Sequence, residues 1–422
     1  TASDYRRSVA EGLYHSMFNA RLNEISQKPG APFLFAYSST SADVRTSDSF
    51  SRFAMVKEDS VERGLQVLAE ETRRVELHGF TKGELERSKA ETLRSYERSK
   101  LERDKNQARR YASEILRHFF EDETMPGIEL ELELVQKFLP TITLEELNSL
   151  ASTWGQNENS VVLIAGPDGL KTPNKGEILA LLDTAGKSQV AAYTDEVSSQ
   201  PLLATEPKAG TITKTRTFEK IGVTEWTLSN GAVVVVKPTD FKNDEIQFSA
   251  FSPGGHSLVD DQDFLSARVA SAIVGQSGLG NHSSVQLRKT LSGKVARAGA
   301  WVGALEEGMW GSASPADLKT FFQLIHLRFS APRVDKEAFA SWKSSQTEWV
   351  RNRRLSPEGS FFDDMNSFLS KDHLRRRPMT VQSLEKVNHD KALAIYRERF
   401  ADASDFSFVF VGNIDLAAFQ PM

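Results

Sequence analysis

Residues 226–278 read WTLSNGAVVVVKPTDFKNDEIQFSAFSPGGHSLVDDQDFLSARVASAIVGQSG, and this stretch decides the fold of the chain. An apolar run at residues 233–236 predicts one strand, and the alternation of apolar with polar residues at 246–250 predicts a second. Gly254 and Gly255, which follow the second strand, are typical of a turn. Aspartates then precede apolar residues at helical spacing, an arrangement that places acids at the positive end of a helix. These apolar residues are Leu265, Val269, Ala272 and Ile273. The stretch therefore predicts two strands and a helix that packs on their sheet.

This order of strands, glycine turn and helix resembles the domain of the pitrilysin/insulinase zinc peptidases. The motifs that carry the resemblance are LSNGAVVVVKPT at 228–239, SPGG at 252–255 and GFTKGELERSKAETL at 79–93. In catalytic copies the helix carries HxxEH, whose two histidines bind zinc and whose glutamate activates a water. Here the matching stretch, 267–271, reads Ala-Arg-Val-Ala-Ser, and none of these residue types holds zinc. The resemblance thus implies a peptidase fold of inverzincin type, in a copy that does no chemistry.

The two halves of the chain repeat one plan. TITLEELNSL at 141–150 matches MTVQSLEKVN at 379–388, and SVVLIAGPDG at 160–169 matches FSFVFVGNID at 406–415. The second pair predicts, in each half, a buried strand that ends at glycine. An internal repeat of this size predicts two homologous α+β domains, each a mostly antiparallel sheet covered by helices on one face.

We expect the domains at residues 1–165 and 218–422. Between them, residues 166–217 are rich in Gly, Ser, Thr, Pro and Lys, a composition typical of a linker. The resemblance implies that these are the second and third of the family's four domains, with the opening strands of the second absent from the sequence. It also implies that zinc lies in a first domain that the sequence does not contain.

Local signals define several elements. Thr81 followed by Glu84 fits a capping box, which predicts the start of a long charged helix. Apolar residues become sparse at 99–106, so we expect this helix to break there. Residues 295–302 and 305–313 predict two strands around a glycine.

Composition excludes several classes of function. The net charge of −5 provides no basic excess, so nucleic acid is not an expected partner. The chain has no cysteine, which removes disulfides, thiolate zinc sites and cysteine nucleophiles. No apolar run approaches the ~20 residues that a membrane span needs. The compartment stays open, with the resemblance and the missing cysteines favouring a periplasmic or secreted protein.

Histidine spacing argues against a zinc site. The eight histidines are His15, His78, His118, His256, His282, His326, His373 and His389. No two of them stand three or four residues apart, as a zinc-binding helix requires. His118 shares a helix face with Glu121, which is typical of a surface pair. His256 and His282 flank glycine turns, where we expect solvated side chains. The sequence therefore predicts no catalytic, cofactor-binding or metal-ligating residue.

Two further motifs allow a binding interpretation beside a structural one. GQSGLG at 275–280 follows a helix instead of a strand and lacks a Lys-Ser/Thr pair, so it indicates a helix end rather than a phosphate loop. Arg375, Arg376 and Arg377 form the densest basic run. This run is suited to binding acidic peptides, although such runs are more often solvated loops.

Two functions follow from the sequence. The first is a non-catalytic part of a zinc metallopeptidase, which lines the clamshell chamber where peptides or unfolded polypeptides are hydrolysed. Its partners would then be the remaining domains of the same protein. The alternative is an inactive scaffold or binding partner that kept the peptidase fold. An HxxEH motif upstream in the gene would favour the first function.

Overall fold

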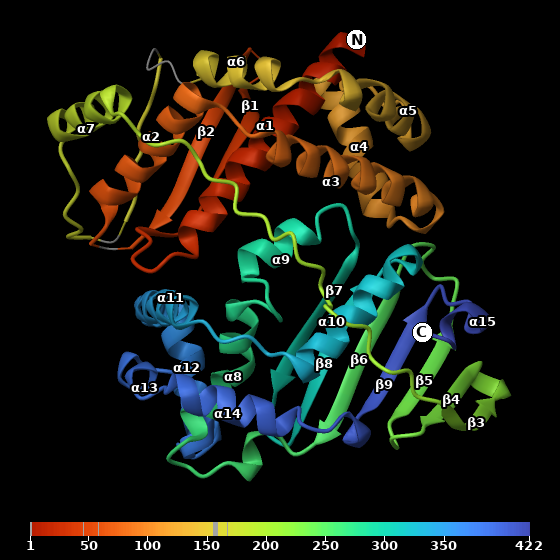
Figure 1. Ribbon diagram of the computed structural model, residues 1–422. Helices are drawn as coiled ribbons and strands as arrows, with labels where there is room; N and C mark the ends of the chain where they lie inside the picture. Colours follow the sequence, from red (N-terminus) through yellow and green to blue (C-terminus); the bar gives the residue numbers. More distant parts are fainter. Residues whose placement is uncertain (1, 45, 58, 155–158, 167) are drawn as a thin grey trace. The chain divides into compact units, whose positions relative to one another are not determined.

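The computed structural model describes residues 2–44, 46–57, 59–154, 159–166 and 168–422. The chain forms two compact units, Thr1–Glu196 (unit 1) and Val197–Met422 (unit 2). Each unit combines helices with a mostly antiparallel sheet, so the fold is α+β, as predicted (Figure 1). No helix in the described ranges is both long enough and apolar enough to cross a membrane.

Unit 1 is mainly helical. Its elements are α1 (Ala2–Ser26), β1 (Phe33–Val44), β2 (Ser47–Val56), α2 (Val61–His78), α3 (Lys82–Leu101), η1 (Arg103–Lys105), α4 (Ala108–Glu121), α5 (Ile128–Phe138), η2 (Leu139–Thr141), α6 (Leu144–Trp154) and α7 (Lys175–Lys187). Strands β1 and β2 pair antiparallel, and α1 packs along them (Figure 1). Leu13, Met17 and Phe18 of α1 fill the core of the unit, because their helical spacing places them on one face.

Two local predictions in unit 1 are confirmed. The Thr81 side chain accepts from the backbone N–H of Glu84, and the Glu84 side chain accepts from the N–H of Thr81, which completes the capping box of α3. The charged helix breaks as expected: α3 ends at Leu101, η1 follows, and α4 begins at Ala108.

The predicted buried strand at 160–165 is wrong. These residues adopt no regular secondary structure, and the side chains of Val161 and Leu163 are 91% and 87% exposed. A β-strand is stabilised by hydrogen bonds to neighbouring strands. In the described part of unit 1 the sheet contains only β1 and β2. The apolar sequence is therefore present without strands to pair with it.

Unit 2 contains the larger sheet. Its elements are β3 (Ile212–Phe218), η3 (Glu219–Ile221), β4 (Val223–Leu228), β5 (Val233–Pro238), β6 (Ile246–Pro253), η4 (Gly255–Leu258), α8 (Phe264–Ser277), α9 (Ser284–Thr290), β7 (Ala296–Val302), β8 (Glu306–Ala313), η5 (Pro315–Asp317), α10 (Leu318–Ser330), α11 (Lys336–Leu355), α12 (Pro357–Leu369), η6 (Leu374–Arg376), α13 (Val381–Glu385), α14 (His389–Arg399), η7 (Ala403–Asp405), β9 (Ser407–Gly412) and α15 (Leu416–Phe419).

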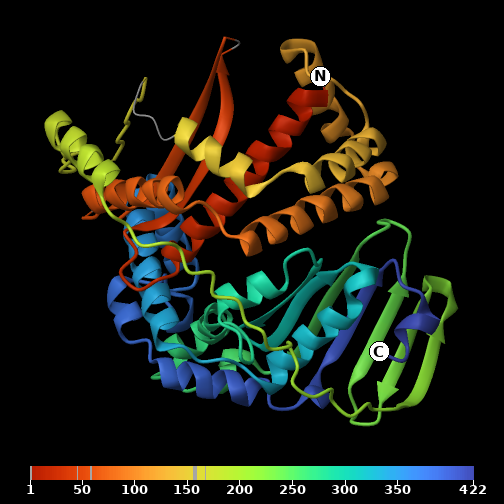
Figure 2. The same cartoon turned by 45° about the horizontal axis from the view of Figure 1, so that its top comes forward.

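The strand order in this sheet is β3-β4-β5-β9-β6-β8-β7. The neighbours pair antiparallel except β5 and β9, which run parallel. Helices α8 and α10 lie against β7, and Figure 2 shows α10 lying along one face of the sheet. The strands at 295–302 and 305–313 are confirmed as β7 and β8 within one residue at their starts.

The predicted linker at 166–217 ends inside β3, which pairs with β4. The reason is the sequence of β3, ITKTRTF, whose residues are mostly polar and exposed. A strand at the edge of a sheet needs no apolar alternation, so composition alone made this stretch resemble a linker.

Candidate functional site

Helix α8 is the helix that the resemblance matches to the zinc-binding helix of catalytic copies. It follows β6 and the glycine turn, and it packs against β7, α11 and α14. Ala267 and Ala270 are fully buried, so the helix presents methyl groups to the core at these positions. Zinc is bound in proteins by sulfur, imidazole nitrogen or carboxylate oxygen. The residues of α8 therefore do not fit a zinc site.

Arg268, between these two alanines, carries a cationic side chain that cannot ligate a metal. Its Nη1 donates to the backbone oxygen of Arg377 at 2.9 Å, and burial lowers the pKa of its guanidinium. Arg268 therefore ties α8 to the segment that follows η6. Within the described ranges, no group of three or more His, Cys, Asp or Glu side chains is placed to hold a metal ion.

The turn before α8 is held by a buried carboxylate. Glu307 of β8 is 3% exposed and accepts a hydrogen bond from the backbone N–H of Gly255. Burial raises the pKa of this carboxyl, while the Gly255 N–H and Arg399 oppose that rise. Gly255 has φ +66°, and a Cβ there would meet the backbone oxygen of Gly303 at 2.5 Å. The glycine is thus required by close approach, and nothing in the sequence indicated that Glu307 is its partner.

Arg375, the first residue of the basic run, stabilises the same turn from outside. Its guanidinium donates to the backbone oxygens of His256 and Val259 and to the carboxylate of Asp261. It also lies 5.2 Å from the ring centroid of Phe264, the first residue of α8. These contacts favour the structural interpretation of Arg375 over a peptide-binding one.

The histidines singled out by sequence take local roles. His118 Nδ1 lies 2.7 Å from the backbone oxygen of Glu123 on the surface. His256 is half-buried against Phe264, and burial together with Arg375 lowers its pKa. His282 is 0% exposed, and its Nε2 lies 3.1 Å from the backbone oxygen of Gln200. The expectation of a solvated turn is therefore wrong for His282, because residues preceding β3 cover it.

The GQSGLG stretch ends α8 as expected. Gly278 is the C-cap of the helix, with φ +99° and its N–H bonded to the Gly275 oxygen. A Cβ at Gly278 would meet the His282 backbone oxygen at 2.2 Å. The glycine serves a helix end followed by a tight turn.

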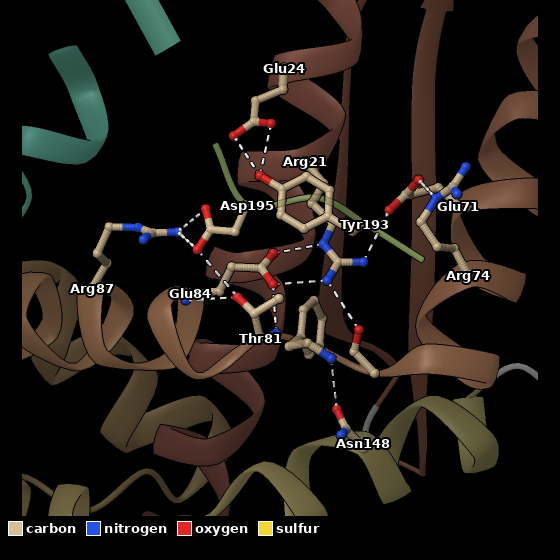
Figure 3. Close-up of polar contacts among 12 residues, drawn as sticks. Arg21, Glu24, Glu71, Arg74, Thr81, Glu84, Arg87, Asn148, Tyr193 and Asp195 are labelled. Carbon is tan, nitrogen blue, oxygen red and sulfur yellow. Dashed lines mark hydrogen bonds and ion pairs between the residues drawn. The ribbon is translucent and has the colours of Figure 1, made fainter. Parts of the chain in front are cut away.

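Unit 1 contains a different concentration of charge, centred on Arg21 of α1 (Figure 3). Arg21 is 1% exposed. Its Nε and Nη2 donate to the two oxygens of Glu84 at 2.6 and 2.8 Å, its Nη1 to Glu71 at 3.3 Å, and its Nη2 to the Gly79 oxygen at 3.0 Å. The guanidinium lies 4.9 Å from the ring centroid of Phe80 and 4.2 Å from that of Tyr193. A guanidinium enclosed in this way holds the fold together and is not offered to a substrate.

Sequence reasoning missed this cluster, because its members lie far apart along the chain. Arg21 and Glu84 are 63 residues apart. The capping-box pattern did identify Glu84, though only as a local helix-start residue.

Comparisons with known proteins identify relatives in sequence and neighbours in fold. No family model matches the chain. The chain is 26% identical over 425 residues to the zinc protease PQQL-like of Arabidopsis thaliana, covering 100% of this chain and 39% of that protein. It is 23% identical over 409 residues to the probable zinc protease PqqL of Escherichia coli (strain K12), covering 94% and 43%. It therefore spans about two fifths of the length of these curated relatives.

Two solved structures share the fold. The ferredoxin protease FusC, crystallised as a mutant in complex with Arabidopsis ferredoxin, gives a TM-score of 0.61 at 17% identity and covers 99% of this chain and 46% of that one. Pitrilysin gives a TM-score of 0.52 at 12% identity and covers 100% and 45%. At such low identity these structures bear on the fold alone, while the sequence match to the relatives extends over the whole chain. These matches support the resemblance of the chain, in sequence and in fold, to the pitrilysin/insulinase family of zinc metallopeptidases.

Proposed function

We propose that this chain is a non-catalytic portion of a zinc metallopeptidase that hydrolyses peptide bonds, and that its two units form part of the wall of the substrate chamber. The observation that carries this proposal is helix α8, where Ala267 and Ser271 stand at the positions of the two zinc-binding histidines of catalytic copies and buried Ala270 at that of the glutamate. The named relatives, which are about two and a half times longer than the matched region, support a larger protein. Zinc would then be held by a domain outside this sequence.

The proposed domains are residues 1–165 as the second of four and 218–422 as the third. In unit 2, β8 pairs on one side with β7 and on the other with β6. By the repeat, the hairpin of β1 and β2 corresponds to β7 and β8. One side of β2 would therefore receive the strands that the first copy lacks, and β1 would stay at the edge.

Two features suit the wall of a peptide chamber. Strands β1 and β7 each lie at the edge of the described sheets, where an extended polypeptide can add as a further strand. Beside the β1 edge, one face of the hairpin presents four large side chains that are 42–46% exposed, namely Phe35, Tyr37, Phe53 and Met55. An unfolded polypeptide offers both the backbone groups and the apolar side chains that these surfaces bind. FusC, described as a ferredoxin protease, is a relative in fold whose substrate is itself a polypeptide.

PqqL of E. coli is described as a periplasmic protease. We extend a periplasmic location to this protein as part of the proposal, since the sequence match to the E. coli PqqL covers most of the chain.

A peptidase assay tests the proposal. A quenched fluorescent peptide is incubated with this chain, with the full-length protein, and with a full-length variant whose HxxEH glutamate is replaced by glutamine. We expect cleavage by the unmodified full-length protein alone, and its loss on chelation of zinc. Chelator-sensitive cleavage by this chain would refute the non-catalytic assignment. A full-length protein that has no HxxEH motif and cleaves nothing would instead support the alternative, an inactive scaffold or binding partner.

A further inference from the structure

Helix α4 turns its polar face toward η1 and α5 and its apolar face toward solvent. It lies with α3 and α5 at one end of unit 1 (Figure 1), and none of its residues is buried. The polar face lines a cavity between η1, α4 and the start of α5, to which it contributes Arg110, Ser113, Glu114 and Arg117. The apolar face carries side chains that are 53–75% exposed, namely Ile115, Leu116, Phe119 and Phe120. Amphipathic helices usually bury the apolar face, so the reversed orientation of α4 encloses a polar space.

The space that α4 encloses, which we call the α4 cavity, has a volume of about 570 Å³. Binding sites for small molecules have volumes of ~300–1,000 Å³ and are lined mostly by apolar side chains. The α4 cavity matches these sites in size, but four arginines and three glutamates line it. It is therefore suited to a small charged ligand and not to an apolar one.

Two of the four arginines have partners. Arg103 forms an ion pair with Glu129 at 2.5 Å, and Arg117 forms one with Glu123 at 2.6 Å. Four other charged side chains of the cavity form no side-chain hydrogen bond or ion pair in the described parts of the chain: Arg109, Arg110, Glu114 and Glu131. Two cations and two anions thus line one space without bonding to each other.

These charges nevertheless act on one another across the cavity. Burial raises the pKa of the Glu131 carboxyl, and Glu114 raises it further, whereas Arg110 lowers it. Glu114 and Glu131 are both half-buried, and a charge that is withdrawn from water without a partner is unfavourable. A ligand with a positive group beside the two glutamates and a negative group beside the two arginines would give all four side chains a partner.

We propose that the α4 cavity binds a molecule that carries both an ammonium and a carboxylate group, namely a free amino acid or a short peptide with unblocked ends. The carboxylate accepts from the guanidinium groups of Arg109 and Arg110, which suit the planar carboxylate, and the ammonium donates to Glu131 and Glu114. Hydrolysis of peptide bonds releases compounds of this class. A role in holding such products rests on the function proposed above, whereas the binding itself does not.

Isothermal titration calorimetry of this chain tests the site without any peptidase activity. The probe is the tripeptide Ala-Ala-Ala with free ends, which should bind at one site per chain. Acetylation of its amine or amidation of its carboxylate should each weaken binding at least tenfold, because each removes a charge-assisted contact. Titration of alanine and of Ala-Ala beside the tripeptide shows whether the cavity prefers a single amino acid or a peptide.

Two substitutions assign the ends of the ligand to the two sides of the cavity. Arg110→Gln should weaken binding of the free tripeptide at least tenfold and remove the effect of amidation, while the effect of acetylation remains. Glu131→Gln should do the reverse. Because each variant keeps its response to the other end of the peptide, a loss of fold cannot imitate this result.

Arg63→Gln and Glu86→Gln are the matched controls, since they make the same changes of charge on exposed side chains of unit 1 outside the cavity. Both should leave the affinity within twofold of that of the unsubstituted chain. The site is overturned by a tripeptide that does not bind, by one that binds equally well when either end is blocked, or by an affinity unchanged in Arg110→Gln and Glu131→Gln. A full-length protein without peptidase activity would leave these titrations unaffected, so the cavity and the proposed function fail separately.

Discussion

Two apolar segments of similar sequence have opposite structures in the two units. Residues 160–166, SVVLIAG, lie without regular structure in unit 1, and Ser407–Gly412, SFVFVG, form β9 in unit 2. Strand β9 lies between β5 and β6 and pairs with both along its length. Such a sequence therefore becomes a strand only where neighbouring strands supply backbone partners and an apolar face.

Truncation of one side chain in each segment tests most directly whether only the second segment is packed. Phe410 of β9 is 2% exposed and its ring lies 4.9 Å from Phe248 and 5.0 Å from Phe419. Phe410→Ala should lower the free energy of unfolding of unit 2 by ~3–5 kcal/mol. Leu163→Ala should change that of unit 1 by less than ~0.5 kcal/mol, as exposed substitutions do. Urea unfolding followed by tryptophan fluorescence measures both, and a large loss in Leu163→Ala would show that 160–166 is packed after all.

The proposed domain order predicts that the unit 1 segment becomes a strand in a longer chain. If residues 160–165 pair with strands that precede this sequence, a chain extended at its N-terminus should slow amide hydrogen exchange at these residues at least tenfold, equivalent to ~1.4 kcal/mol. Exchange in β9 should be unchanged and serves as the control. Equal exchange rates at 160–165 in the two chains would count against the proposed domain order.

How much of this could be foreseen depends on whether a feature is local. The capping box of Thr81 and Glu84 and the helix break before α4 follow from neighbouring residues, and sequence found them. The enclosure of Arg21 could not be found, because Tyr193 comes from the far end of unit 1. Composition likewise did not indicate that residues of the predicted linker make contacts in unit 1, where Tyr193 covers Arg21 and Asp195 accepts from Arg87.

Similarly, the prediction that α8 carries no zinc ligand rests on residue types at fixed spacing, which are visible along the chain. Glu307, which holds the turn before α8, was not, because a buried carboxylate bonded to a backbone N–H leaves no pattern along the chain. Sequence therefore indicates which ligands a helix offers more readily than which contacts stabilise the turn before it.

The cores of the two units should also differ in their response to pH. His15 of unit 1 lies beside the rings of Phe50 and Trp154, with Nδ1 at 2.8 Å from the Ser38 hydroxyl and Nε2 at 2.8 Å from that of Thr40. Burial lowers its pKa, so the unfolded chain binds the proton more readily than the folded one. The stability of unit 1 should therefore fall as pH drops below about 6.5, by at most ~1.4 kcal/mol per pH unit.

Fluorine NMR of a fluorotryptophan-labelled chain can follow this loss, because Trp154 is the one tryptophan in the sequence of unit 1. His15→Gln removes the titrating group and should flatten the slope for unit 1. Burial also lowers the pKa of His256, so unit 2 is expected to show a separate slope that His15→Gln leaves intact. A slope in unit 1 that survives His15→Gln would assign the effect to another group.

The smallest expected effect concerns the threonines that precede α13 in unit 2 and α6 in unit 1. Thr380 accepts from the Ser383 N–H at 3.1 Å, and the Ser383 hydroxyl accepts from the Thr380 N–H at 2.8 Å. Thr143, which precedes α6 in unit 1, accepts from the Glu146 N–H at 3.3 Å, while the Glu146 carboxylate forms an ion pair with Arg6. Replacing either threonine by alanine leaves a helix N–H without its cap, which costs about 1 kcal/mol. Each loss should appear only in the unfolding of its own unit, and replacement by serine should restore most of it. If Thr143→Ala weakened both units equally, the two repeats would be folding as one cooperative block, and their treatment as separate copies of one plan would fail.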